Sequence, residues 1–128
     1  MQNSRKGAHT LYDLKYHIVW VTKYRKPILT TRRAVRTREL IREIAQSKNV
    51  QILKGCVSKD HVHLFVSVPP SLAISGLVQY FKGKTSRKLL QEDKTLAKTN
   101  WSQHHWGTGV LFVTTSGSGH TRNNHALY

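Results

Sequence analysis

Residues 60–68 alternate apolar with other residues at a period of two, which is typical of a β-strand with one buried face. The apolar positions of this stretch are Val62, Leu64, Val66 and Val68. His61, His63 and Phe65 fall on the opposite face. The two prolines that follow end the strand, because proline cannot donate a hydrogen bond to a neighbouring strand. We therefore expect a strand that presents two histidines on the open face of a sheet.

The remaining pattern predicts three more strands and two helices. Aromatic and β-branched residues predict strands over 16–21, 50–57 and 110–115. Apolar residues at helical spacing predict helices over 31–48 and 72–91, with Ser71 as the N-cap of the second. The order β-α-β-β-α-β predicts an α+β protein with a ferredoxin-like (split βαβ) fold, in which an antiparallel sheet carries two helices on one face.

The 128 residues are expected to form one domain with a single core. Residues 1–12 are polar and basic and predict a flexible arm, whereas residues 118–128 lack an apolar pattern and predict a disordered tail. Residues 92–108 are predicted as a loop that holds two tryptophans and two histidines. The single cysteine, Cys56, lies in a predicted strand and is interpreted as a small buried hydrophobic residue.

Charge indicates the class of partner. The chain has 21 lysines and arginines against 6 aspartates and glutamates, a net charge of +15, which favours a nucleic acid. Two basic runs are candidate DNA contacts, although an ordinary solvated surface would look similar in sequence. The first run interleaves a tyrosine with cations, and the second lies on the predicted helix 72–91. Their candidate residues are Lys23, Tyr24, Arg25, Lys82, Lys84, Arg87 and Lys88.

Other partners are disfavoured. No apolar run approaches the roughly 20 residues of a membrane-spanning helix, and no apolar segment follows the first residues as it would in a signal peptide. One cysteine fits a reducing compartment. We therefore expect a cytoplasmic protein that acts on DNA, with neither a membrane nor a nucleotide cofactor as a partner.

The paired histidines are the candidate chemical centre. Two imidazoles at positions i and i+2 of a strand can converge on one metal ion, although eight histidines can also produce this spacing by chance. A divalent ion such as Mg²⁺ or Mn²⁺ at His61 and His63 would polarise a phosphate. Covalent phosphoryl transfer also needs a nucleophile. The residues alone do not choose among the tyrosines, which are Tyr12, Tyr16, Tyr24, Tyr80 and Tyr128.

Three runs together resemble the small single-tyrosine HUH transposases of insertion sequences, the TnpA type. They are residues 16–25, 60–64 and 81–87, and Trp106-Gly107 with the strand that follows also fits. The resemblance extends over roughly residues 9–117. Three motifs in the right order make it specific in combination.

The resemblance implies a homodimer with a ferredoxin-like core, which recognises hairpins in single-stranded DNA and moves its element by single-strand excision and insertion. It implies that His61 and His63 bind a divalent metal. It also implies that a tyrosine on a C-terminal helix attacks a DNA phosphate, forming a 5′-phosphotyrosine link and freeing a 3′-OH. A glutamine one turn later would be the third metal ligand.

The C-terminal segment departs from this pattern. Tyr128 lies close to the position expected for the nucleophile, but no glutamine follows it in this sequence. One interpretation is a truncated, catalytically inactive relative that acts only as a hairpin DNA-binding protein. In the other, Tyr128 is the nucleophile and another residue, such as His125, completes the metal site. A third hypothesis, an RNA-binding ferredoxin-like domain, rests on fold analogy alone.

Overall fold

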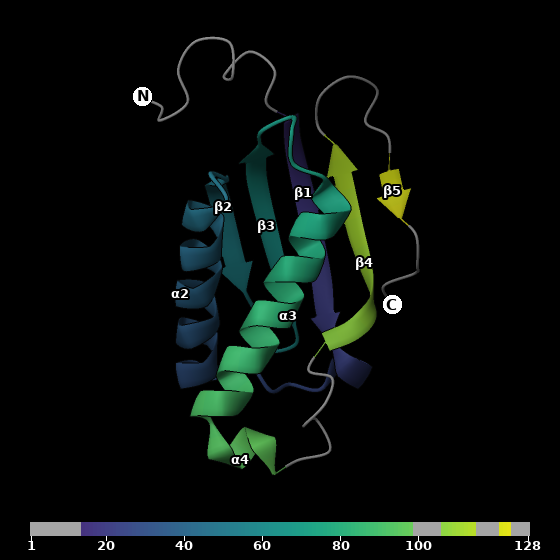
Figure 1. Cartoon of the computed structure of the whole chain (residues 1–128). Helices are drawn as coiled ribbons and strands as arrows, with labels where there is room; N and C mark the ends of the chain where they lie inside the picture. Colours follow the sequence, from purple (N-terminus) through teal and green to yellow (C-terminus); the bar gives the residue numbers. More distant parts are fainter. Residues whose placement is uncertain (1–13, 99–105, 115–120, 124–128) are drawn as a thin grey trace.

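In the described part of the chain, five antiparallel strands form one sheet, and two long helices cover one of its faces (Figure 1). The structure, a computed structural model, describes residues 14–98, 106–114 and 121–123. The strands are β1 (Leu14–Thr22), β2 (Gln51–Val57), β3 (His61–Val68), β4 (Trp106–Thr114) and β5 (Thr121–Asn123), in the spatial order β2-β3-β1-β4-β5. The helices are α2 (Thr31–Ser47), α3 (Ile74–Glu92) and α4 (Lys94–Ala97), and a 3₁₀ turn, η1 (Lys23–Arg25), follows β1.

The predicted α+β, ferredoxin-like arrangement is confirmed. The order β1-α2-β2-β3-α3-β4 matches the expected β-α-β-β-α-β, and the four long strands and two long helices lie within a few residues of their predicted bounds except at the start of β4. Figure 1 shows α2 and α3 on the same side of the sheet, with α3 crossing in front of its central strands. The opposite face of the sheet carries no helix from the described residues.

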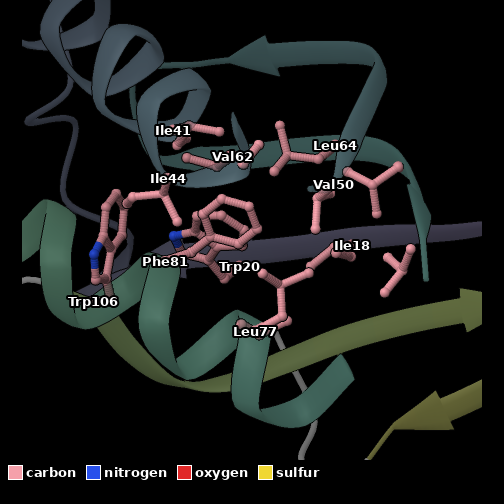
Figure 2. Packing of buried hydrophobic residues seen from close by; sticks show 14 of the residues in the cluster. Ile18, Trp20, Ile41, Ile44, Val50, Val62, Leu64, Leu77, Phe81 and Trp106 are labelled. Carbon is pink, nitrogen blue, oxygen red and sulfur yellow. The ribbon is translucent and has the colours of Figure 1, made fainter. Parts of the chain in front are cut away.

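The central pair of strands, β1 and β3, builds the core. Trp20 lies opposite Val62 and Ile18 opposite Leu64, and all four side chains are buried. They pack against apolar positions of both helices, among them Ile41, Ile44, Leu77 and Phe81 (Figure 2). Because side chains alternate along a strand, this packing sends the intervening residues to the face without helices.

Trp106 of β4 connects α3 to the sheet through hydrogen bonds of its indole ring. Its indole Nε1 donates to the Lys82 carbonyl oxygen at 3.1 Å and to the Thr85 hydroxyl oxygen at 3.0 Å. The ring meets Trp20 edge-on inside the core (Figure 2). Gly107 follows where a Cβ would lie only 3.3 Å from a methyl carbon of Val21, so the close approach of β4 to β1 favours glycine here.

Several local predictions were wrong. The loop predicted over 92–108 contains the short helix α4, and it ends earlier because Trp106 already pairs with Thr22 and begins β4. The second helix begins at Ile74 with Ala73 as its N-cap, rather than Ser71. Cys56 is exposed, because its pairing with His63 places it on the face without helices.

The predicted disordered tail over 118–128 contains one described element. Thr121–Asn123 forms β5, which pairs with β4 at the edge of the sheet (Figure 1). The other residues of that tail and the arm over 1–12 lie outside the described residues. Within the described segments, no helix has the length and apolarity that crossing a membrane requires.

Truncation of a core aromatic tests this packing. Phe81 is fully buried and its ring stacks on Trp20, so Phe81→Ala is expected to lower the free energy of unfolding by about 3–5 kcal/mol. Its neighbour Tyr80 is 37% exposed, and Tyr80→Ala is expected to cost much less. Chemical denaturation of both variants makes the comparison. Equal losses would contradict the assignment of Phe81 to the core.

Candidate metal and DNA site

His61 and His63 lie on the open face of the sheet, as the alternation of residues predicted. In β3, Val62 and Leu64 point to the helices. His61 is half-buried and His63 is exposed on the other face. The pairing of β1 with β3 adds a neighbour to this face, because His17 lies opposite Phe65. The His17 and Phe65 rings stack with centroids 4.5 Å apart. The open face therefore carries three histidines and an aromatic ring.

Asp60 holds the first histidine. Its Oδ1 lies 2.9 Å from Nδ1 of His61, and this hydrogen bond is the main reason that the pKa of the Asp60 carboxyl is lowered. An ionised carboxylate can only accept, so Nδ1 of His61 carries the proton. Nε2 of a neutral His61 is then left with its lone pair. Metal-binding histidines commonly use a carboxylate in this way to fix the tautomer and orientation of the ring.

His17 holds the second histidine. Its Nδ1 lies 3.3 Å from Nε2 of His63, a distance at which one ring donates to the other. Partial desolvation, followed by repulsion from His17 and His61, lowers the pKa of His63. His63 is thereby kept neutral, as a metal ligand must be.

These residues fit a metal ion in their chemistry, although they form no complete cage. Among residues 14–98, no three His, Cys, Asp or Glu side chains are grouped to hold an ion. His61 and His63 would supply two imidazoles and leave the remaining coordination positions for water and for phosphate oxygens. The predicted metal ligands His61 and His63 therefore stand on one open, partly desolvated face.

The first basic run lies at the same end of the sheet as His61. Thr22 donates its backbone N–H to the carbonyl oxygen of Asp60 at 2.9 Å. Arg25 Nε lies 3.5 Å from Asp60 Oδ2. The structure thus brings the turn η1, with Lys23, Tyr24 and Arg25, next to the histidine site.

The second basic run lies on the other layer of the protein. Lys82, Lys84, Arg87 and Lys88 belong to α3, which covers the face opposite the histidines. Lys82 donates its Nζ to the carbonyl oxygen of Gly107 at 2.8 Å, and burial lowers its pKa. The predicted contacts therefore lie on two different elements, η1 and α3. Tyr128, the predicted nucleophile, and His125 lie outside the described residues.

Two residues of this site were missed in the sequence. Outward positions of a strand follow from its apolar alternation, so the buried Ile18 and Trp20 mark His17 as an open-face residue. The sequence pattern does not show, however, which residue of β3 lies opposite it. Asp60 was considered only as the first residue of the stretch 60–68, because its contact with His61 depends on a side-chain conformation.

Histidine titration tests the electrostatics of this face. Partial desolvation and neighbouring charge disfavour protonation, so His63 is expected to titrate below the ordinary value of 6.5. His17→Phe keeps a ring beside Phe65 but removes one repelling charge, so it is expected to raise the pKa of His63. Nitrogen-detected NMR of the imidazoles measures both values. Titration of His63 at or above 6.5 in the native chain would contradict this account.

Known proteins are similar in sequence to this chain over most of its length. A family model described as "Transposase IS200 like" matches residues 10–125. The ISDra2 transposase TnpA of Deinococcus radiodurans is 30% identical over 112 residues, which cover 88% of this chain and 80% of that protein. The transposase for insertion sequence element IS200 of Salmonella typhimurium is 31% identical over 114 residues, which cover 89% of this chain and 75% of that protein.

Solved structures agree with these relatives. A crystal structure from Deinococcus radiodurans R1, assigned as a transposase, superposes with a TM-score of 0.77 at 28% identity, covering 91% of this chain and 87% of that one. A REP-associated tyrosine transposase bound to a REP hairpin shares the fold alone, with a TM-score of 0.59 at 15% identity over 98% of this chain and 64% of that one. From its family match, its relatives and its fold, the chain belongs to the IS200-like transposases.

Proposed function

We propose that this transposase cleaves and rejoins single-stranded DNA beside a hairpin, through a 5′-phosphotyrosine intermediate and a divalent ion, Mg²⁺ or Mn²⁺. The observation that carries the proposal is the pair His61 and His63 on the open sheet face, with the Asp60 carboxylate bonded to His61. A bound divalent ion would polarise the scissile phosphate and stabilise the charge that develops on its oxygens. The imidazoles would hold that ion against the sheet.

The surrounding residues prepare the site for a polyanion. The pKa values of Asp60 and His63 are both lowered, so near neutral pH the carboxylate is charged and His63 is neutral. Asp60 keeps the Nδ1 proton on His61, which leaves the Nε2 lone pair available to an ion. Lys54, whose charge acts on His63 from β2, adds a cation that attracts phosphate. The open face would therefore offer a neutral His63 to the ion, with the Lys54 cation nearby to attract the phosphate.

The covalent step needs a tyrosine, and we propose Tyr128, which lies close to the position where the resemblance expects the nucleophile. Its phenolic oxygen would form a bond to phosphorus while the bond from phosphorus to the 3′ oxygen breaks. The phenolic proton would pass to the leaving oxygen, giving a free 3′-OH. Reversal of the same step on another 3′-OH would rejoin the strand, so no external energy source is needed.

Two features support the DNA partner. The net charge of +15 favours binding to a polyanion, and the basic residues of η1 and α3 offer two surfaces for it. The REP-associated transposase that shares this fold binds a REP hairpin. We propose that this chain likewise binds a hairpin in single-stranded DNA and acts as a homodimer.

Removal of the carboxylate partner tests the metal site. Asp60→Ala frees the His61 ring to rotate and to change tautomer, so the affinity for Mn²⁺ is expected to fall about 10- to 100-fold. Asp93→Ala is a matched control, because Asp93 also has a lowered pKa but bonds Arg33 near α4. Isothermal titration of Mn²⁺ into the folded proteins measures the effect. An unchanged affinity in Asp60→Ala would argue against this positioning.

A covalent adduct tests the reaction. The chain is incubated with Mn²⁺ and single-stranded DNA that carries the ends of its element, then examined by denaturing gel and mass spectrometry. We expect an adduct on Tyr128 that disappears in Tyr128→Phe and in the double variant His61→Ala/His63→Ala, while hairpin binding persists.

The other outcomes separate the competing functions. DNA cleavage by the double variant His61→Ala/His63→Ala would contradict the metal mechanism. Hairpin binding by the native chain without any adduct would favour the non-catalytic DNA-binding protein. Tighter binding to an RNA hairpin of the same sequence would favour the RNA-binding hypothesis.

A further inference from the structure

The turn after β1 has an unusual backbone. Tyr24 (φ 58°, ψ 20°) and Arg25 (φ 52°) are consecutive residues in the left-handed region. A side chain with a Cβ is disfavoured there, and a bulky one such as tyrosine is an outlier. Glycine would adopt this conformation without strain. A tyrosine at this position suggests that its ring has a use that compensates for the backbone cost.

Hydrogen bonds of Thr22 and Lys26 stabilise this turn. Thr22 is fully buried, and its hydroxyl donates to the carbonyl oxygen of Lys26 at 2.8 Å. Lys26 in turn donates its N–H to the carbonyl oxygen of Lys23 at 3.3 Å. Together with the bond from Thr22 to Asp60, these contacts fix the path of the backbone on both sides of Tyr24. Its side chain is thus presented from a preorganised loop.

The ring itself faces solvent. Tyr24 is 78% exposed, more than any other exposed large hydrophobic residue in the described part of the chain. It belongs to neither hydrophobic cluster of the core. Its contact is with Lys23, whose Nζ lies 5.4 Å from the ring centroid. An exposed aromatic face between two cations, Lys23 and Arg25, has the chemistry of a site for a nucleobase and its flanking phosphates.

The turn that carries this ring adjoins the histidine site. Val21 pairs with His61, so η1 begins only two residues from the strand position opposite that histidine. Arg25 and His61 both contact the Asp60 carboxylate, on Oδ2 and Oδ1 respectively. Tyr24 is therefore the chain neighbour of Arg25, whose ion-pair partner Asp60 also bonds the proposed metal ligand His61.

We propose that Tyr24 is a stacking platform for one unpaired base of the single strand whose phosphate is held at His61 and His63. The inference rests on the proposed function, because it describes how the same site binds single-stranded DNA. Every base offers a π-face, so such a platform would hold the strand in place rather than read its sequence. The rigid turn would reduce the entropy that binding has to overcome, and would thereby align the phosphate next to the base.

The test uses single-stranded oligonucleotides with 2-aminopurine at successive positions, without a divalent ion, so that no cleavage occurs. Stacking quenches this fluorophore, and we expect strong quenching at one position next to the cleavage site. Tyr24→Phe is expected to keep the quenching and the affinity. Tyr24→Ala is expected to lose the quenching and to weaken binding about 5- to 150-fold, which corresponds to one base stacked on an aromatic ring.

Two further variants separate a lost ring from a damaged fold. Tyr24→Gly removes the ring and relieves the left-handed backbone, so it is expected to bind as weakly as Tyr24→Ala while melting at a higher temperature. Tyr80→Ala removes another exposed tyrosine, on α3 in the opposite layer, and is expected to leave the quenching unchanged.

The outcomes also separate this inference from the proposed function. Native-like affinity and quenching in Tyr24→Ala would overturn the stacking platform and leave the transposase function intact. The same holds if Tyr80→Ala, but not Tyr24→Ala, abolishes the quenching. If the native chain failed to bind the oligonucleotide at all, the proposed function and the stacking platform would both be overturned.

Discussion

The antiparallel pairing of β1 with β3 ties the core of this protein to its histidine face. One set of alternate residues, which includes Ile18, Trp20 and Val62, is buried beneath α2 and α3. The other set then has to point away from the helices, and it contains His17, His61 and His63. A shift of one residue in this register would bury the histidines and expose the apolar side chains. The packing that stabilises the fold therefore also determines where the candidate chemistry lies.

Asp60 connects this face to the turn that follows β1. Its carbonyl oxygen accepts from the backbone of Thr22, and its carboxylate contacts both Arg25 and His61. One short segment thus fixes the orientation of a candidate metal ligand and the position of an exposed basic turn. The charges of Arg25 and Lys59 act on this carboxylate, which therefore balances part of their positive charge. This arrangement suits a site that has to receive a phosphate beside a neutral imidazole.

The sequence predicted the parts of this structure that depend on local periodicity. Alternation over 60–68 placed His61 and His63 on one open face, and helical spacing located α2 and α3 to within a few residues. Features that depend on contacts between distant segments were missed. The buried position of Trp106 follows from its bonds to α3, and the exposure of Cys56 follows from its pairing with His63. His17 was missed for the same reason, because periodicity within β1 does not reveal which strand lies beside it.

Electron spin echo spectroscopy of bound Mn²⁺ tests the central claim most directly, since it detects nitrogen atoms coordinated to the ion. The account predicts coupling to imidazole nitrogen in the native chain, and loss of that coupling in the double variant His61→Ala/His63→Ala while the protein remains folded. A comparison of histidine labelled with nitrogen-15 and unlabelled histidine would assign the coupling to side chains of this residue type. Coupling to oxygen ligands alone, or nitrogen coupling that persists in the double variant, would contradict the claim that these two histidines form the metal site.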